Sequence, residues 1–102
     1  AIMIHCKEKD PKELFDFCER FKNFSQKVPL VAVPSSYSQI SERQLSKIGI
    51  NVVIYANHLL RSAYPAMVKT AKSILKEGKS DIASEKYCMS ISKILRLIPE
   101  DY

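Results

Sequence analysis

Polar side chains follow each of three short apolar runs in this 102-residue chain. Side chains of these types donate hydrogen bonds and carry positive charge, and none of them is a carboxylate. That combination is what a phosphoryl- or carboxylate-bearing substrate requires. Both histidines of the chain fall among them. In chain order the candidate residues are His5; then Ser35, Ser36 and Tyr37; then Asn57, His58 and Arg61.

Each candidate also has a structural interpretation. A lone histidine at the end of a strand often has no catalytic role, and Ser35 and Ser36 can be turn residues after a proline. Asn57 and His58 can cap the helix that follows, and Arg61 can be a surface cation. An Asn-His-x-x-Arg pattern at a strand-to-helix turn nevertheless also builds an anion site.

The cysteines and histidines do not predict a metal site. Cys6, Cys18 and Cys88 are odd in number, widely spaced and without a C-x-x-C pattern, which argues against a disulfide framework or structural zinc. A zinc site formed by His5 and His58 lacks a third ligand at suggestive spacing. We therefore expect no metal ligands in this chain and a reducing, cytoplasmic location.

Composition favours one folded domain without a nucleic-acid or membrane partner. The chain is 46% hydrophobic and 26% charged, which is ordinary for a globular domain. Its net charge of +5 comes from Lys and Arg residues scattered along the chain rather than gathered in a run. No apolar run approaches the roughly 18 residues of a membrane span.

Alternating strand and helix patterns account for most of the sequence. Strands are expected over residues 1–4, 28–33 and 50–55, where continuous apolar runs have strand length. A first helix should begin at Asp10-Pro11-Lys12-Glu13, which supplies a cap, a proline at the first helical position and a glutamate placed to complete a capping box. A second capping box at Ser41 should open another helix, which Gly49 stops. A long helix from about residue 59 to Gly78 must accommodate Pro65, and a last helix near residues 90–98 should end at Pro99.

This order predicts an α/β fold with a parallel sheet covered by helices on both faces. Three strands alone make a poor sheet, and the chain opens inside a strand. We therefore expect the carboxyl-terminal part of a larger fold, either a (β/α)₈ TIM-type barrel or a doubly wound sheet. The last helix carries an apolar stripe that needs another surface, namely Ile91, Ile94, Leu95 and Ile98.

Three sequence segments, AIMIH, VPLVAVPSSY and VVIYANHLLR, resemble in order and spacing the last three barrel strands of the phosphoenolpyruvate mutase family, within the isocitrate lyase superfamily. The resemblance extends over essentially the whole chain. It departs from the family at Cys6, where serine is frequent, at Ser35, where threonine is common, and at Tyr55, where tryptophan is frequent.

The resemblance implies a magnesium-dependent barrel that interconverts phosphoenolpyruvate and phosphonopyruvate, the step that forms the carbon–phosphorus bond in phosphonate biosynthesis. It implies that His5 is catalytic and contacts the phosphoryl group. Direct substrate contact by the other six candidates is inferred from their position, and support of the pocket is an equal alternative. Phosphonopyruvate hydrolases carry similar segments, and a non-catalytic anion-binding or assembly module is a third hypothesis.

The resemblance also implies how the chain is divided and assembled. Residues 1–102 are expected to be one fragment, with the last three βα units in 1–88 and the terminal helix in 89–102. The family's magnesium ligands, its phosphoryl-binding arginine and its gating loop lie upstream, so the fragment alone should be inactive. Exchange of the terminal helix between subunits would make the protein a homo-oligomer.

Overall fold

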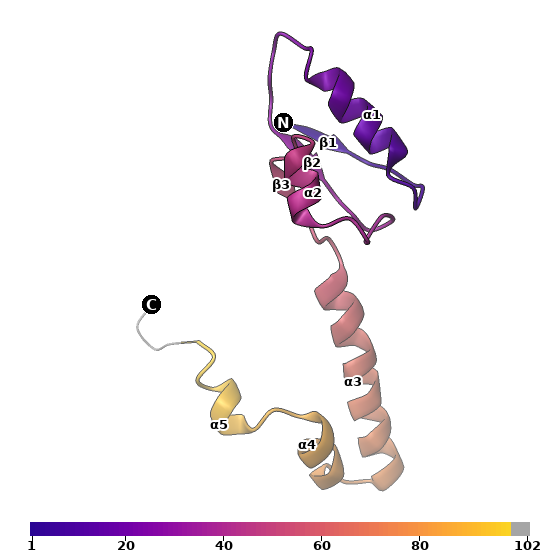
Figure 1. Cartoon of the computed structure of the whole chain (residues 1–102). Helices are drawn as coiled ribbons and strands as arrows, with labels where there is room; N and C mark the ends of the chain where they lie inside the picture. Colours follow the sequence, from indigo (N-terminus) through magenta and orange to yellow (C-terminus); the bar gives the residue numbers. More distant parts are fainter. Residues whose placement is uncertain (99–102) are drawn as a thin grey trace. The chain divides into compact units, whose positions relative to one another are not determined.

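The structure is a computed structural model that describes residues 1–98. The chain divides into two compact units, the first spanning Ala1–Ala56 and the second beginning at Asn57. Each unit is described by itself below. Figure 1 shows the order of the elements along the chain.

The first unit alternates strands and helices. Its elements are β1 (Ile2–Ile4), α1 (Lys12–Phe21), β2 (Leu30–Ala32), α2 (Glu42–Lys47) and β3 (Val52–Val53). The strands form one parallel sheet in the order β1-β2-β3, with Ile4 paired with Ala32 and Ala32 paired with Val53. The α/β fold with parallel strands is therefore confirmed.

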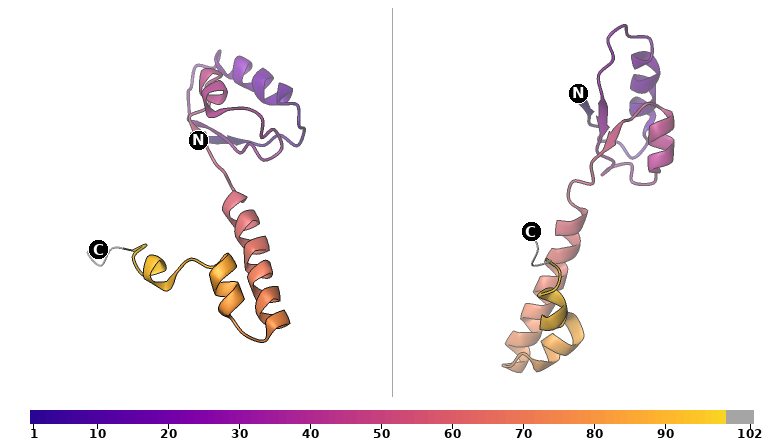
Figure 2. Two further views of the ribbon diagram at one scale, coloured as in Figure 1. Left: turned by 60° about the horizontal axis from the view of Figure 1, so that its bottom comes forward. Right: turned by 90° about the vertical axis from the view of Figure 1, so that its left-hand side faces the viewer.

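Helices α1 and α2 cover one face of this sheet (Figure 2). The core lies between the helices and the sheet. It is built from alternate residues of the strands, from the inner faces of the helices and from residues next to the strands. On the opposite face the side chains of Met3 and Val52 are 61% and 47% exposed. Burial of the strand at residues 28–33 on both faces is not completed within this unit, because no described helix of the unit covers the second face, where Val31 is half-buried. The nine core residues are Cys6, Leu14, Cys18, Phe21, Leu30, Ala32, Tyr37, Leu45 and Ile50.

The two helices begin differently. At α2 the predicted capping box is confirmed, because the Ser41 hydroxyl accepts from the Gln44 amide at 3.2 Å and the Gln44 side chain accepts from the Ser41 amide at 2.9 Å. At α1 the N-cap is Pro11, without a side-chain cap, and the Asp10 carboxylate accepts from the amide of Lys12 at 3.1 Å. The reciprocal box expected at α1 is therefore not formed.

The second unit contains the helices α3 (His58–Glu77), α4 (Asp81–Tyr87) and α5 (Ile91–Ile94). Helix α3 contains Pro65 and ends at Gly78, whose φ of 64° is the left-handed conformation that lets the chain turn into α4. Helix α4 contacts α3 and buries Ala83. No helix within residues 1–98 is both long and apolar enough to cross a membrane.

Two sequence expectations fail in the second unit. Helix α4 was not expected, because its apolar positions are too few to make a clear helical stripe. The helix expected over residues 90–98 is only α5, four residues long, and turns and bends follow it up to Ile98. Pro99, which was expected to end that helix, lies outside the described residues.

Candidate functional site

His5 lies immediately after β1, at the edge of the sheet where all three strands end. The register places His5, Val33 and Ile54 at the next position of their respective strands. The Ile54 amide still donates to the Ala32 carbonyl at 2.9 Å, so the pairing of the strands persists to this edge. The His5 side chain is exposed. It is therefore open to a ligand at the carboxyl edge, which is where parallel sheets bind ligands.

Ser35 and Ser36 follow β2 and come to the same edge as His5. The Ser35 amide donates to the Val33 carbonyl at 2.9 Å, which is a tight turn directly after the strand. Ser35 is exposed and Ser36 is half-buried. The turn interpretation of Ser35 is thus correct, and its exposed hydroxyl is also available to a ligand. The role of both serines in binding stays a prediction.

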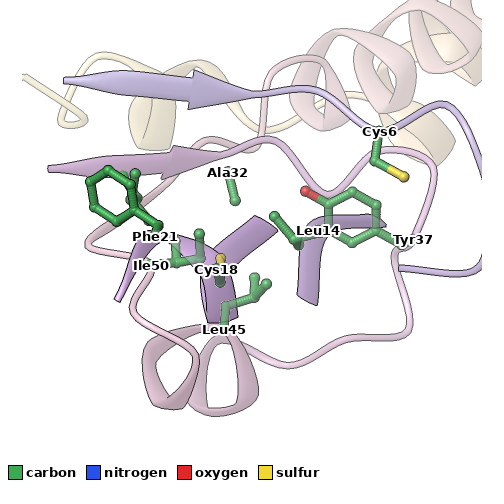
Figure 3. Close-up of a cluster of buried hydrophobic side chains, with 9 residues drawn as sticks. Cys6, Leu14, Cys18, Phe21, Ala32, Tyr37, Leu45 and Ile50 are labelled. Atoms are coloured by element: carbon green, nitrogen blue, oxygen red, sulfur yellow. The ribbon is translucent and has the colours of Figure 1, made fainter. Parts of the chain in front are cut away.

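Tyr37 points into the core. Its side chain is 0% exposed, and its ring lies beside Cys6 and Leu14 (Figure 3). Within residues 1–98 its hydroxyl has no hydrogen-bond partner. Burial is the main cause that raises the pKa of Tyr37; the thiol of Cys6 adds to the rise, and the backbone of Val33 opposes it without forming a hydrogen bond of acceptable geometry. This placement favours support of the pocket over contact with a substrate.

The unpaired hydroxyl makes Tyr37→Phe an informative substitution. A buried polar group without a partner costs about 1–3 kcal/mol, and an apolar group of the same shape does not carry that cost. We expect Tyr37→Phe to leave the free energy of unfolding unchanged or to raise it by up to about 1 kcal/mol. Tyr37→Ala should lower it by about 3–5 kcal/mol. Urea unfolding monitored by circular dichroism measures both. A Phe variant less stable than wild type by more than about 1 kcal/mol would show that the hydroxyl has a partner.

The same substitution tests the raised pKa. As pH rises, the unfolded chain loses the Tyr37 proton at its ordinary pKa of about 10, which is a lower pH than the folded chain needs. The folded state then binds more protons, so this contribution to stability is complete below that pH and is lost as pH rises above it. Burial also raises the pKa of Cys18, and that contribution has the same sign. The alkaline loss of stability should therefore be smaller in Tyr37→Phe than in wild type but not absent.

A side-chain hydrogen bond ties the loops that carry these residues. The Gln39 side-chain amide donates to the Lys9 carbonyl at 2.9 Å, and so joins the loop after β2 to the loop after β1. The Cys6 thiol is buried and lies 3.6 Å from the Glu8 carbonyl. Sequence reasoning missed Gln39, because a lone glutamine in a polar loop carries no pattern.

Asn57, His58 and Arg61 belong to the second unit, at the start of α3. Asn57 takes the N-cap position, but its side chain makes no capping hydrogen bond. The Arg61 amide donates to the Asn57 carbonyl at 2.9 Å, so the first turn of the helix is formed. All three side chains are exposed. Their participation in one site with His5 stays a prediction.

The candidate residues do not form a metal site by themselves. Magnesium prefers carboxylate and water oxygens, and none of the seven candidates carries a carboxylate. Among residues 1–98 no group of three or more His, Cys, Asp or Glu side chains could hold a metal ion. A role for the seven candidates in binding an anion stays a prediction.

Comparison with known proteins decides between the possible families. A family model described as phosphoenolpyruvate phosphomutase matches residues 1–75, which include all seven candidates. This chain belongs to the phosphoenolpyruvate mutase family. The resemblance inferred from the three strand segments is therefore confirmed.

Two curated relatives show how much of the family the chain represents. It is 35% identical over 101 residues to a phosphoenolpyruvate phosphomutase of Tetrahymena pyriformis, covering 99% of this chain and 32% of that protein. It is 42% identical over 81 residues to a phosphonopyruvate hydrolase of Variovorax sp. (strain Pal2), covering 76% of this chain and 26% of that protein. The chain thus spans between a quarter and a third of these mutase-family relatives.

Solved structures of the family agree with the fold. A crystal structure of phosphoenolpyruvate phosphomutase from Streptomyces platensis subsp. rosaceus matches with a TM-score of 0.79 and 35% identity, over 93% of this chain and 32% of that one. A phosphonopyruvate hydrolase in complex with oxalate and Mg²⁺ matches with a TM-score of 0.76 and 32% identity, over 93% of this chain and 32% of that one.

Proposed function

We propose that the protein containing this chain is a phosphoenolpyruvate mutase, which moves a phosphoryl group between the enol oxygen of phosphoenolpyruvate and the methylene carbon of phosphonopyruvate. One observation supports this most directly. In a chain of this family, an exposed histidine, His5, stands at the carboxyl edge of the parallel sheet. The exposed hydroxyl of Ser35 accompanies it there, and no carboxylate among the seven candidates would repel an anionic substrate.

In this proposal His5 is the catalytic residue of the chain. Phosphoryl transfer passes through a loose transition state whose charge is spread over the equatorial oxygens. A histidine side chain that donates to those oxygens stabilises the charge as it develops. Arg61 suits the substrate carboxylate, because a guanidinium donates two parallel hydrogen bonds to a carboxylate. The other proposed binding residues are Ser35, Ser36, Asn57 and His58, whereas Tyr37, predicted from sequence to bind substrate, is proposed to support the pocket from the core.

Activity is proposed for the whole protein rather than for these residues alone. The chain covers 32% of the mutase from Tetrahymena pyriformis. We propose that it forms the last three βα units of a (β/α)₈ barrel and that Mg²⁺ binds to residues outside it. The exposed second face of the sheet supports the first proposal, and the Mg²⁺ in the similar phosphonopyruvate hydrolase complex supports the second. The isolated chain should therefore give no turnover.

Phosphonopyruvate hydrolase is the second candidate. The 42% identity to the Variovorax hydrolase exceeds the identity to the mutase from Tetrahymena, although over fewer residues. The two reactions share a substrate and differ in the group that receives the phosphoryl. In the mutase it is the enolate oxygen of the same molecule, and in the hydrolase it is water.

A coupled assay separates the two candidates. The complete protein is incubated with phosphonopyruvate and Mg²⁺ in the presence of lactate dehydrogenase and NADH, which report pyruvate. A mutase gives no NADH oxidation until pyruvate kinase and ADP are added to convert phosphoenolpyruvate into pyruvate. Immediate oxidation identifies the hydrolase. No oxidation in either stage contradicts both enzymes and favours a non-catalytic anion-binding or assembly module.

We further propose that the protein is a homo-oligomer joined through its last described segment. The apolar side chains of this segment are exposed in the chain and would be buried by contact with another subunit: Ile91, Ile94, Leu95 and Ile98. Substituting Ile94 and Leu95 by Lys should shift the complete protein to a smaller assembly in analytical ultracentrifugation, because two charges would be buried in the interface. Lys93→Gln serves as the control on the same segment. An unchanged sedimentation coefficient in the double variant would contradict this interface.

A further inference from the structure

A groove between α3 and α4 gathers lysine side chains that the proposed reaction does not use. It has a volume of about 300 Å³ and lies wholly within the second unit. The three lysines contributed by α3 follow each other at spacings of three and four residues, and so lie on one face of the helix. The charged and aromatic residues that line the groove are Lys69, Lys72, Lys76, Glu77, Lys86 and Tyr87.

The groove keeps a positive charge. Four lysines line it against one glutamate, Glu77, whose carboxylate is 3.9 Å from the Lys76 ammonium. Asp81, at the start of α4, is engaged elsewhere by Lys79 at 3.0 Å, and this contact lowers the pKa of its carboxyl group. Like charges at these spacings destabilise a helix. An anionic ligand would remove that repulsion.

One lysine of the groove is held in place by an aromatic ring. The Lys69 ammonium lies 5.7 Å from the centre of the Tyr87 ring, within the range of a cation–π interaction. Tyr87 and Lys69 also line an adjoining hollow of about 430 Å³ together with Pro65 and Ala66. At the end of the groove that adjoins this hollow, the Lys69 ammonium is therefore held against the Tyr87 ring.

We propose that this groove binds a linear chain of phosphate groups, either free or as the triphosphate of a nucleotide. Lys69 and Lys76 are seven residues apart, about 10 Å along the helix axis. A single phosphate cannot contact both ends of such a row, whereas consecutive phosphates can. Lys86 contributes from α4, so the ligand would bridge the two helices. The proposal does not depend on the reaction assigned to His5.

Isothermal titration calorimetry of the complete protein with tripolyphosphate tests the proposal. We expect saturable binding that weakens about tenfold or more in the Lys69→Gln/Lys72→Gln variant, and that weakens with added salt. The matched control is Lys12→Gln/Lys47→Gln, which removes two exposed lysines of the first unit and should bind as wild type does. Binding that is not saturable, or an equal loss in the control, would overturn the proposal.

Two further titrations separate this groove from the catalytic site and identify the source of the phosphates. Affinity for tripolyphosphate should be unchanged when phosphonopyruvate is present at saturation; complete competition would place the binding at the catalytic site and overturn the proposal. ATP that binds as tightly as tripolyphosphate assigns recognition to the phosphates alone. Tighter binding of ATP that falls in Tyr87→Leu but not in Tyr87→Phe assigns the added affinity to stacking on the ring.

Discussion

His5→Ala should lower kcat of the complete protein for phosphonopyruvate by about 100- to 1000-fold, the usual effect of removing one donor aimed at developing charge. His5 is exposed at the carboxyl edge of the sheet, so the truncation should leave the core unchanged. KM should change less than kcat, because the contact strengthens as charge develops in the transition state. Steady-state kinetics with a coupled pyruvate assay measures both constants.

Two variants make this prediction sharper. His5→Gln keeps a hydrogen-bond donor and should recover part of the lost kcat if hydrogen bonding matters more than charge. Lys47→Gln, on α2, removes an exposed cation outside the candidate site and should retain the wild-type rate. If kcat of His5→Ala is within a factor of about three of wild type, well below the effect expected for such a donor, His5 is not catalytic.

Leu14→Ala should lower the free energy of unfolding by about 2–5 kcal/mol. Leu14 is 0% exposed and lies in the core between α1 and the sheet, next to Tyr37 (Figure 3). Truncation removes buried apolar area and leaves a cavity that the tightly packed neighbours cannot fill. Urea denaturation of the complete protein, followed by circular dichroism, measures the change.

Leu75→Ala is the matched control for Leu14→Ala. Leu75 lies on α3 and is 83% exposed, so its truncation should change the free energy of unfolding by less than about 0.5 kcal/mol. If both variants lose equal stability, the core described for the first unit does not dominate its folding.

The positions of the first unit's elements followed from short-range patterns. The apolar runs placed β1, β2 and β3, and the capping box placed the start of α2, because an apolar run and a capping box are each formed by a few consecutive residues. The exposure of the second face of the sheet did not follow from sequence. Residues such as Met3 and Val52 are apolar, and a sequence cannot say whether the surface that covers them belongs to the same chain.

The sequence placed the candidate residues after the strands, but it did not give the direction of their side chains. All seven candidates follow strands, and His5 and Ser35 are exposed as a site requires. Tyr37 turns into the core instead, since its ring fills the space beside Cys6 and Leu14. The groove between α3 and α4 was also not expected, because it depends on α4, whose short sequence carries little periodicity.

For the reaction that we propose, the choice between mutase and hydrolase depends on whether water reaches the phosphoryl group. Exclusion of water depends on what closes over the carboxyl edge of the sheet. The chain covers 26% of the Variovorax hydrolase and 32% of the mutase from Tetrahymena, and we propose that the covering elements lie outside this segment. Product analysis of that protein is therefore more informative than further comparison of this segment.

Phosphorus NMR of the complete protein with phosphonopyruvate and Mg²⁺, run beside the His5→Ala variant, tests the central claim most directly. We predict that the phosphonopyruvate and phosphoenolpyruvate resonances interconvert, that little inorganic phosphate forms, and that the exchange is lost in the variant. Inorganic phosphate as the main product, or no change in the spectrum of the wild-type protein, would contradict the mutase assignment. Unchanged interconversion in His5→Ala would contradict the role assigned to His5.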